Sequence, residues 1–189
     1  MAKSVHYTVD VPRGMQRFRE LIVYISGRCA SDPHFGTTKL NKILYHADFR
    51  AFERFGVPLT GMKYFKLPFG PAPKAMLPVL GELEAEGAIS RDPPPKGEHD
   101  QRKTYARREA HMDHFTEDEI DLIEEVIQEL APHTATKVSA DSHGVAWKAR
   151  HMRDEIPYEA AFLLDESPTA DDIMEARELN SRYEWGLRV

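Results

Sequence analysis

The chain has 189 residues, 41% of them hydrophobic and 30% charged, which is typical of a globular domain rather than of a disordered or membrane-spanning protein. A single cysteine, Cys29, excludes an intrachain disulfide and a zinc site built from several cysteines. No apolar run approaches the roughly 20 residues that span a bilayer, and the first residues lack the apolar stretch of a secretory signal. We therefore expect one soluble, cytoplasmic domain over residues 1–189.

The net charge of −6 is unevenly distributed along the chain. Residues 1–78 contain 12 Lys and Arg against 5 Asp and Glu, a net charge of +7. Residues 79–189 contain 13 against 26, a net charge of −13. Such asymmetry is typical either of a nucleic-acid-binding first half or of two surfaces of opposite sign within one domain. The charge distribution alone does not distinguish these two interpretations.

The first two predicted helices cover residues 12–29 and 37–55, where apolar residues recur at helical spacing. Thr37 or Thr38 is the expected side-chain cap of the second helix, and Gly56 is the expected left-handed residue at its end. Because the apolar side of this helix is rich in aromatic residues, we expect it to lie at the centre of the core.

A third helix is predicted after residues 59–72, which indicate a short extended segment followed by a Gly-Pro turn. This helix begins at or beside Pro73 and ends at Gly87, with Pro78 tolerated only if it lies in the first turn or at a kink. Four side chains form its predicted apolar face: Met76, Leu77, Leu80 and Leu83.

A two-stranded ribbon with a polar tip is predicted near residues 88–107, followed by a helix over 116–131. Thr116 and Glu119 have the spacing of a capping box at the start of that helix. A helix followed by a ribbon is typical of a winged-helix domain, which makes nucleic-acid binding a rival interpretation.

The remainder of the chain predicts a short helical segment at 134–147, an apolar segment at 156–164 and a last helix at about 168–185. Acidic residues at the start of the last helix favour its positive N-terminal end. The fold class that follows is mainly α, a compact bundle of about six helices with one small β-hairpin.

Candidate catalytic and metal-binding residues are few. His111 and His114 can share a helical face, but no third ligand has a matching spacing, so we predict no metal site. Cys29 lies on the apolar stripe of the first helix, which favours a buried thiol over a nucleophile. Asp48 lies beside the buried stripe of the second helix, which favours a carboxylate anchored to nearby backbone or to Tyr64 over a general base. We predict no enzymatic activity and no cofactor.

Residues 39–48, with the sequence KLNKILYHAD, resemble the signature helix of the Panacea domain, the SocA-type antitoxin family of bacteria and phages. The resemblance spans about residues 15–160. Further residues are similar to later parts of the family pattern: Gly56, Pro58, Gly61, Tyr64, Phe69-Gly70-Pro71, Val138-Ser139, Ser142-His143, Trp147 and Ile156-Pro157-Tyr158-Glu159.

This resemblance implies a non-enzymatic domain that neutralises a partner toxin by direct binding. The toxin is expected to be encoded by an adjacent gene, and one known relative delivers its toxin to a Clp-type protease. The resemblance carries over no catalytic residue. The lack of a long apolar run predicts no membrane partner, and the strongly acidic second half makes nucleic acid an unexpected partner.

The sequence also offers two rival functions to the antitoxin interpretation. A winged-helix-like regulator would bind phosphates through the ribbon, but the isoelectric point of about 5.8 is far below the value above about 9 that is usual for DNA-binding domains. A hydrolase built on histidines finds no support in their spacing. The ribbon cations through which a winged-helix-like regulator would bind phosphates are Arg91, Lys96, Arg102, Lys103, Arg107 and Arg108.

The family-like motif has two interpretations at the level of residues. In one, it marks a central helix with a Gly-Pro turn packed against it. In the other, the exposed edge of that helix and the turn at residues 62–73 form a partner surface, because aromatic anchors surrounded by charge suit interfaces. The predicted partner-binding residues are Lys39, Lys42, Tyr45, His46, Asp48, Tyr64, Phe69, Gly70 and Pro71, with His143 and Trp147 as further motif residues.

Overall fold

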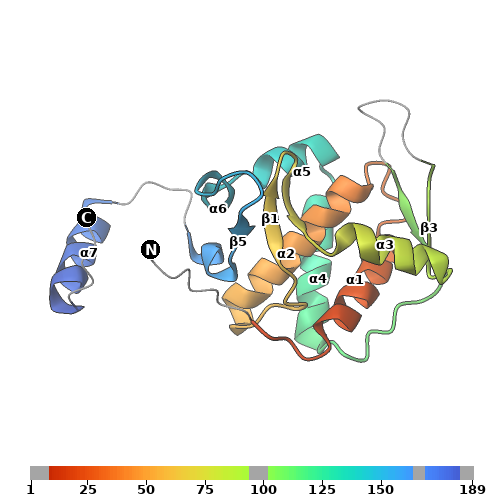
Figure 1. The fold of residues 1–189 in the computed structure, drawn as a ribbon, viewed down its shortest axis with the longest axis horizontal. Helices are drawn as coiled ribbons and strands as arrows, with labels where there is room; N and C mark the ends of the chain where they lie inside the picture. The colour runs from red at the N-terminus through yellow and green to blue at the C-terminus, as the bar shows by residue number, and fades with distance from the viewer. Residues whose placement is uncertain (1–8, 94–101, 164–168, 184–189) are drawn as a thin grey trace.

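The computed structural model describes residues 9–93, 102–163 and 169–183 (Figure 1). This part of the chain is mainly helical with two small antiparallel sheets, which confirms the predicted fold class. Within the described ranges, no helix combines the length and apolar character that crossing a membrane requires. The elements are α1 (Gly14–Arg28), α2 (Thr37–Phe55), β1 (Tyr64–Leu67), β2 (Gly70–Pro73), α3 (Met76–Ala85), β3 (Ile89–Arg91), β4 (Thr104–Ala106), α4 (Glu117–Leu130), α5 (Ala135–Asp141), α6 (Val145–Lys148), β5 (Glu155–Ile156), η1 (Tyr158–Phe162) and α7 (Ala170–Tyr183).

Helix α2 runs through the middle of the molecule, as predicted, and contacts α1, α4, α5, β2 and η1 (Figure 1). A helix that is buried on several sides needs apolar residues around most of its circumference. The sequence provides them, since five apolar side chains of α2 are fully buried: Leu40, Ile43, Leu44, Ala47 and Ala51.

The ends of α2 only partly match the prediction. Thr37 is its first helical residue and Gly36 is the N-cap, without a side-chain cap, so the predicted cap at Thr37 or Thr38 is wrong. The Thr37 hydroxyl instead donates to the Arg102 carbonyl 3.1 Å away, which connects the start of the helix to the segment just before β4. Gly56 ends the helix with a φ of +76°, as predicted.

A three-stranded sheet with the order β2-β1-β5 lies against α2. The sequence predicted only an extended segment and a turn here, because the Gly-Pro-Ala-Pro strand β2 lacks both the alternation and the residue types of ordinary strands. Proline is tolerated in β2 because this strand is an edge of the sheet.

The predicted ribbon is confirmed as the pair β3 and β4, whereas its tip, residues 94–101 with Lys96, lies outside the described residues.

Helix α3 begins at Met76 rather than beside Pro73, because Pro73 is the last residue of β2. Pro78 lies in the first turn, where its missing N–H costs no helical hydrogen bond. The predicted apolar face was partly wrong, since Leu77 is 71% exposed and Val79 is buried in its place.

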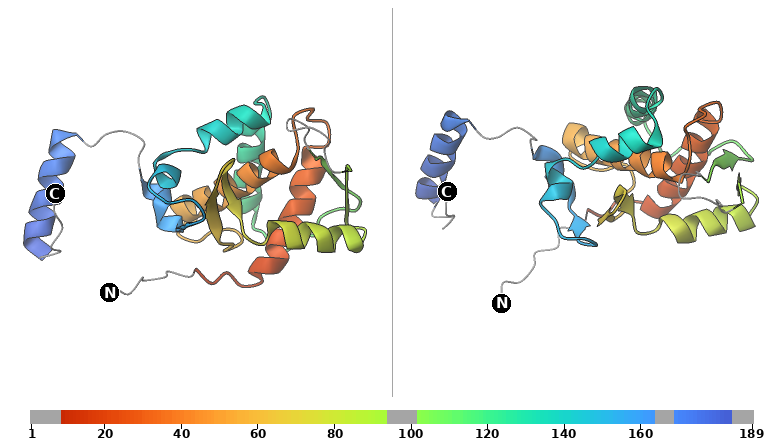
Figure 2. Two further views of the ribbon diagram at one scale, coloured as in Figure 1. Left: turned by 45° about the horizontal axis from the view of Figure 1, so that its top comes forward. Right: turned by 90° about the horizontal axis from the view of Figure 1, so that it is seen from above.

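The predicted capping box of α4 is confirmed. The Glu119 N–H donates to Thr116 Oγ1 at 3.3 Å, and the Thr116 N–H donates to Glu119 Oε2 at 2.8 Å. Helix α7 also forms close to its predicted position, but none of its residues is buried, and it stands apart from the other helices (Figure 1 and Figure 2).

A buried carboxylate joins the main apolar core to a second, aromatic cluster around Tyr64 and Tyr158. The Asp48 carboxylate accepts hydrogen bonds from the Thr60 N–H at 2.7 Å, from the Thr60 hydroxyl, and from the Tyr64 hydroxyl at 2.7 Å. The predicted anchoring of Asp48 to backbone and Tyr64 is therefore confirmed. Burial raises the pKa of Asp48 to about 6.

Replacing Asp48 by Ala is expected to lower the free energy of unfolding by roughly 2–4 kcal/mol, because buried donors on Thr60 and Tyr64 lose their acceptor. Urea unfolding followed by circular dichroism measures this loss. Asp121→Ala is the matched control, since Asp121 is exposed on α4 and its removal should cost less than about 0.5 kcal/mol. Equal losses in the two variants would contradict the anchoring role.

Candidate functional site

Three parts of the family-like motif meet at the turn between β1 and β2. Helix α2 contributes Lys42, the turn contributes residues 67–71, and the α5–α6 segment contributes residues 139–147. Figure 1 shows β1, α5 and α6 lying together beside α2. We call this arrangement the hairpin site.

Side chains from the body of the protein hold the backbone of the turn. Each of three carbonyl groups in the turn accepts a hydrogen bond from a different element, so the turn cannot move without breaking bonds to both α2 and α5–α6. The three bonds run from Trp147 Nε1 to Leu67 O (3.1 Å), from Ser139 Oγ to Phe69 O (2.9 Å) and from Lys42 Nζ to Pro71 O (2.7 Å).

Gly70 is required by this close packing. Its φ of +89° lies in a region that side chains rarely adopt. A Cβ atom at this position would also lie 2.7 Å from Lys42 Nζ and would overlap Ser142 Oγ. The Ser142 hydroxyl in turn donates to the Ser139 carbonyl at 2.7 Å, which fixes it in place.

The aromatic side of the site is a stack. The His143 ring lies parallel to the Trp147 ring, with centroids 4.0 Å apart, and Lys66 Nζ lies 3.8 Å from the Trp147 ring centroid. Lys66 Nζ also donates to the Arg150 carbonyl at 2.8 Å. Burial, followed by the charges of Lys42, Lys66 and Lys148, lowers the pKa of His143.

Both lysines of the KLNK sequence are interior residues. Lys39 is fully buried, and its ammonium group binds Asp32 at 2.6 Å together with the Ala131 and His133 carbonyls beyond the end of α4. Lys42 is 1% exposed, and its removal from water lowers its pKa to about 7. The two side chains link α2 to α4 and to β2.

The structure changes the interpretation of the predicted partner-binding residues. Phe69 is 74% exposed at the tip of the hairpin and His46 is partly exposed. Most of these positions are packed inside the protein, as the first interpretation of the motif expects, and partner contact through any of them stays a prediction. The buried members are Lys39, Lys42, Tyr45, Asp48, Tyr64, Gly70 and Pro71.

Sequence reasoning missed residues whose importance depends on the fold. Thr60 provides two of the bonds to Asp48, and the only signal for it was its place before Gly61 in the family-like succession. Leu67, within the hairpin site, and Met152, in the segment after α6, are 37% and 48% exposed, and no pattern in the sequence distinguished them.

The candidate chemical groups offer no catalytic arrangement. His111 is exposed, and the His114 ring contacts Arg13 at 3.1 Å. Across residues 9–93, 102–163 and 169–183, no group of three or more His, Cys, Asp and Glu could hold a metal ion. Burial raises the pKa of Cys29 to about 12, so its thiol stays protonated and weakly nucleophilic at neutral pH.

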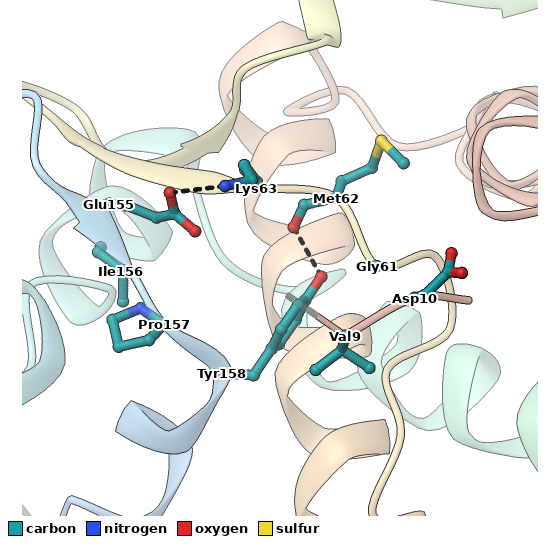
Figure 3. A pocket seen from close by; sticks show the side chains of 9 residues that line it. All are labelled: Val9, Asp10, Gly61, Met62, Lys63, Glu155, Ile156, Pro157 and Tyr158. Atoms are coloured by element: carbon teal, nitrogen blue, oxygen red, sulfur yellow. Dashed lines mark hydrogen bonds and ion pairs between the residues drawn. The ribbon is translucent and has the colours of Figure 1, made fainter. Parts of the chain in front are cut away.

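A pocket of about 320 Å³ lies beside β5, as Figure 3 shows. Two of its charged side chains, Lys63 and Glu155, form an ion pair at 3.2 Å. The Tyr158 hydroxyl donates to the Met62 carbonyl at 2.7 Å, and burial raises the pKa of Tyr158. The Lys63 ammonium and the Glu155 carboxylate therefore neutralise each other, and the Tyr158 hydroxyl stays protonated, so none of these three groups is an activated nucleophile.

The ribbon does not present a free basic surface within the residues described. Four of its six cations bind groups of the protein itself, which leaves them unavailable to nucleic-acid phosphates. These are Arg91 with Glu84, Arg102 with the Asp92 carbonyl, Arg107 with Ser90, and Arg108 with Glu20.

Replacing Gly70 by Ala is expected to lower the free energy of unfolding by roughly 1–3 kcal/mol, because of its positive φ and the contact with Lys42. Chemical denaturation measures the change. Gly81→Ala is the matched control, since Gly81 lies within α3 with open space around it, and this variant should gain about 0.5–1 kcal/mol. A neutral or stabilising Gly70→Ala would show that the turn is not fixed.

Lys42 should make stability depend on pH. Its pKa is about 7 in the folded chain and 10.5 as a free side chain, so between these values the unfolded chain binds the proton and the folded chain does not. Stability therefore rises with pH in this window, and the cost of the buried charge is fully present below pH 7. Unfolding free energies measured from pH 6 to 9 should rise less steeply in Lys42→Met than in the wild type. Parallel curves would show that Lys42 stays charged.

One family comparison gives a match. The family described as antitoxin SocA-like, Panacea domain matches residues 40–148, which is more than half of the chain and extends from α2 to α6. This range contains all the side chains that hold the β1–β2 turn. No curated protein and no solved structure matches the chain. Because the match covers more than half of the chain, the chain belongs to the family of antitoxin SocA-like Panacea domains.

Proposed function

We propose that this protein is an antitoxin that neutralises a toxin by binding it directly, with Phe69 as an anchor of the interface. Family membership indicates an antitoxin-type, non-enzymatic role. The observation that carries the finer proposal is the 74% exposure of Phe69 on a turn that three side-chain hydrogen bonds hold in place.

A fixed, exposed aromatic residue suits an interface anchor for two reasons. Aromatic side chains that fill a pocket on the partner contribute much of the binding free energy of protein interfaces. A turn that is already held in its bound conformation also loses little conformational entropy when the partner binds. In this proposal, Lys42, Ser139 and Trp147 support the anchor rather than contact the toxin.

Direct blocking and delivery to a Clp-type protease are two modes of neutralisation that follow from the same binding event. They differ in the fate of the toxin. A blocked toxin persists in the cell together with its antitoxin, whereas a delivered toxin disappears in cells that have the protease and persists in cells that lack it. Both modes are compatible with the proposed direct binding, and the lifetime of the toxin in these two strains distinguishes them.

Replacing Phe69 by Ala should weaken the complex with the product of the adjacent gene by roughly tenfold or more, equivalent to about 1.4 kcal/mol. Because the side chain is exposed, the unfolding free energy should change by less than about 0.5 kcal/mol. Co-purification, titration calorimetry and rescue of growth during toxin expression measure the effect.

Two controls separate binding from folding. Leu77→Ala removes an equally exposed apolar side chain from α3 and should leave binding unchanged. Tyr45→Ala removes a buried ring and should reduce binding only through a loss of roughly 3–5 kcal/mol in stability. If the neighbouring protein neither inhibits growth nor co-purifies with the wild type, the proposed function is wrong. If Phe69→Ala binds like the wild type, Phe69 is not the anchor.

A further inference from the structure

Most described arginine and lysine side chains bind acceptors within the protein. Ion pairs connect α1 to α3 and α4, and α2 to α4, so these cations are already neutralised locally. The pairs between helices are Arg17–Glu119, Arg19–Glu82, Arg19–Glu86, Arg28–Glu124, Arg50–Glu129 and Arg54–Glu125.

The segment that follows α6 departs from this pattern. Among the described residues, no carboxylate forms an ion pair with Lys148, Arg150 or Arg153, and all three side chains are exposed. The acidic side chains closest in sequence are engaged elsewhere. Asp141 binds Lys137, Asp154 accepts from the His151 N–H, and Glu155 binds Lys63.

Backbone hydrogen bonds place these cations beside the hairpin site. The Lys66 N–H donates to the Asp154 carbonyl at 3.0 Å, and the Arg153 N–H donates to the Lys66 carbonyl at 2.8 Å. Lys66 Nζ reaches the Arg150 carbonyl rather than a carboxylate. Because Lys66 is three residues from Phe69, we call Lys66, Lys148, Arg150 and Arg153 the cationic rim of the hairpin site.

We propose that the cationic rim docks onto an acidic surface of a partner protein whose apolar pocket receives Phe69. This inference rests on the proposed function and names the chemistry of the toxin surface. An apolar centre with a charged edge is the usual arrangement of a protein interface. Unpaired cations at the edge attract an acidic partner over distances of about 10 Å, and this attraction weakens as salt is added.

A protein partner fits this surface better than a nucleic acid does. Single-stranded nucleic acids bind where bases can stack on aromatic rings. The Trp147 ring already contacts His143 and Lys66, so its surface is largely occupied. Among the described residues of this site, Phe69 would then provide the one largely exposed aromatic ring, and the net charge of −6 opposes the approach of a polyanion.

Charge reversal within the full chain tests the inference. The rim variant is Lys148→Glu with Arg150→Glu, and the control variant is Lys103→Glu with Arg177→Glu. Lys103 and Arg177 are described cations for which no ion pair is seen, and they lie on β4's flank and on α7. Both variants change the net charge equally, and thermal melts check that both are folded.

Binding of the purified product of the adjacent gene is measured at about 50 mM and about 300 mM salt. The rim variant is expected to bind at least about tenfold more weakly than the wild type at low salt and to lose most of the salt dependence. The control variant should stay within about twofold of the wild type, because its cations lie outside the rim.

The alternative outcomes are separable. If the rim variant binds like the wild type, this inference is wrong while the proposed function stands. If the wild type binds nothing from the adjacent gene, the proposed function and this inference both fail. A single-stranded RNA or a duplex DNA of about 20 nucleotides serves as a further probe. Wild-type binding of either probe that the rim variant abolishes would overturn the inference in favour of nucleic acid.

Discussion

The structure depends on the burial of ionisable side chains along α2. Lys39, Lys42 and Asp48 lie within the interior, and each needs partners because an unpaired buried charge is costly. Those partners come from segments remote in sequence, the end of α4, strand β2 and the loop at Thr60. The position of each segment around α2 is therefore specified by a polar contact, in addition to the apolar packing that would tolerate several arrangements.

This organisation separates the supporting residues of the hairpin site from the residues proposed to contact a partner. The residues that give the family its recognisable pattern are mostly inside, where they hold a turn, and the surface that they present is formed by fewer and less distinctive side chains. A partner could therefore be exchanged by altering the exposed side chains while the supporting bonds of Lys42, Ser139 and Trp147 stay the same. The specificity of a surface of this kind resides in its tip and its edge.

Much of the fold could be predicted from the sequence, because helical periodicity, the Thr116 capping box and Gly56 are local signals. The family could also be predicted from the sequence, and Phe69 was among the residues predicted to contact a partner. The β1–β2–β5 sheet was not, because its pairing depends on contacts with α2 and on a strand containing two prolines. Lys42 could not be recognised as buried, because its acceptor is a backbone carbonyl 29 positions away. The cationic rim emerges only when the ion pairs of the other cations are known.

Helix α7 has a consequence for how the protein unfolds. None of its residues is buried, and its 14 residues are close to the length at which an isolated helix is marginal in water. Its helical state therefore gains little from the packing that makes the rest of the chain cooperative. We therefore expect α7 and the body of the protein to have separate stabilities. A single melting temperature describes the body, whereas α7 loses its helicity gradually over a wide range of temperature.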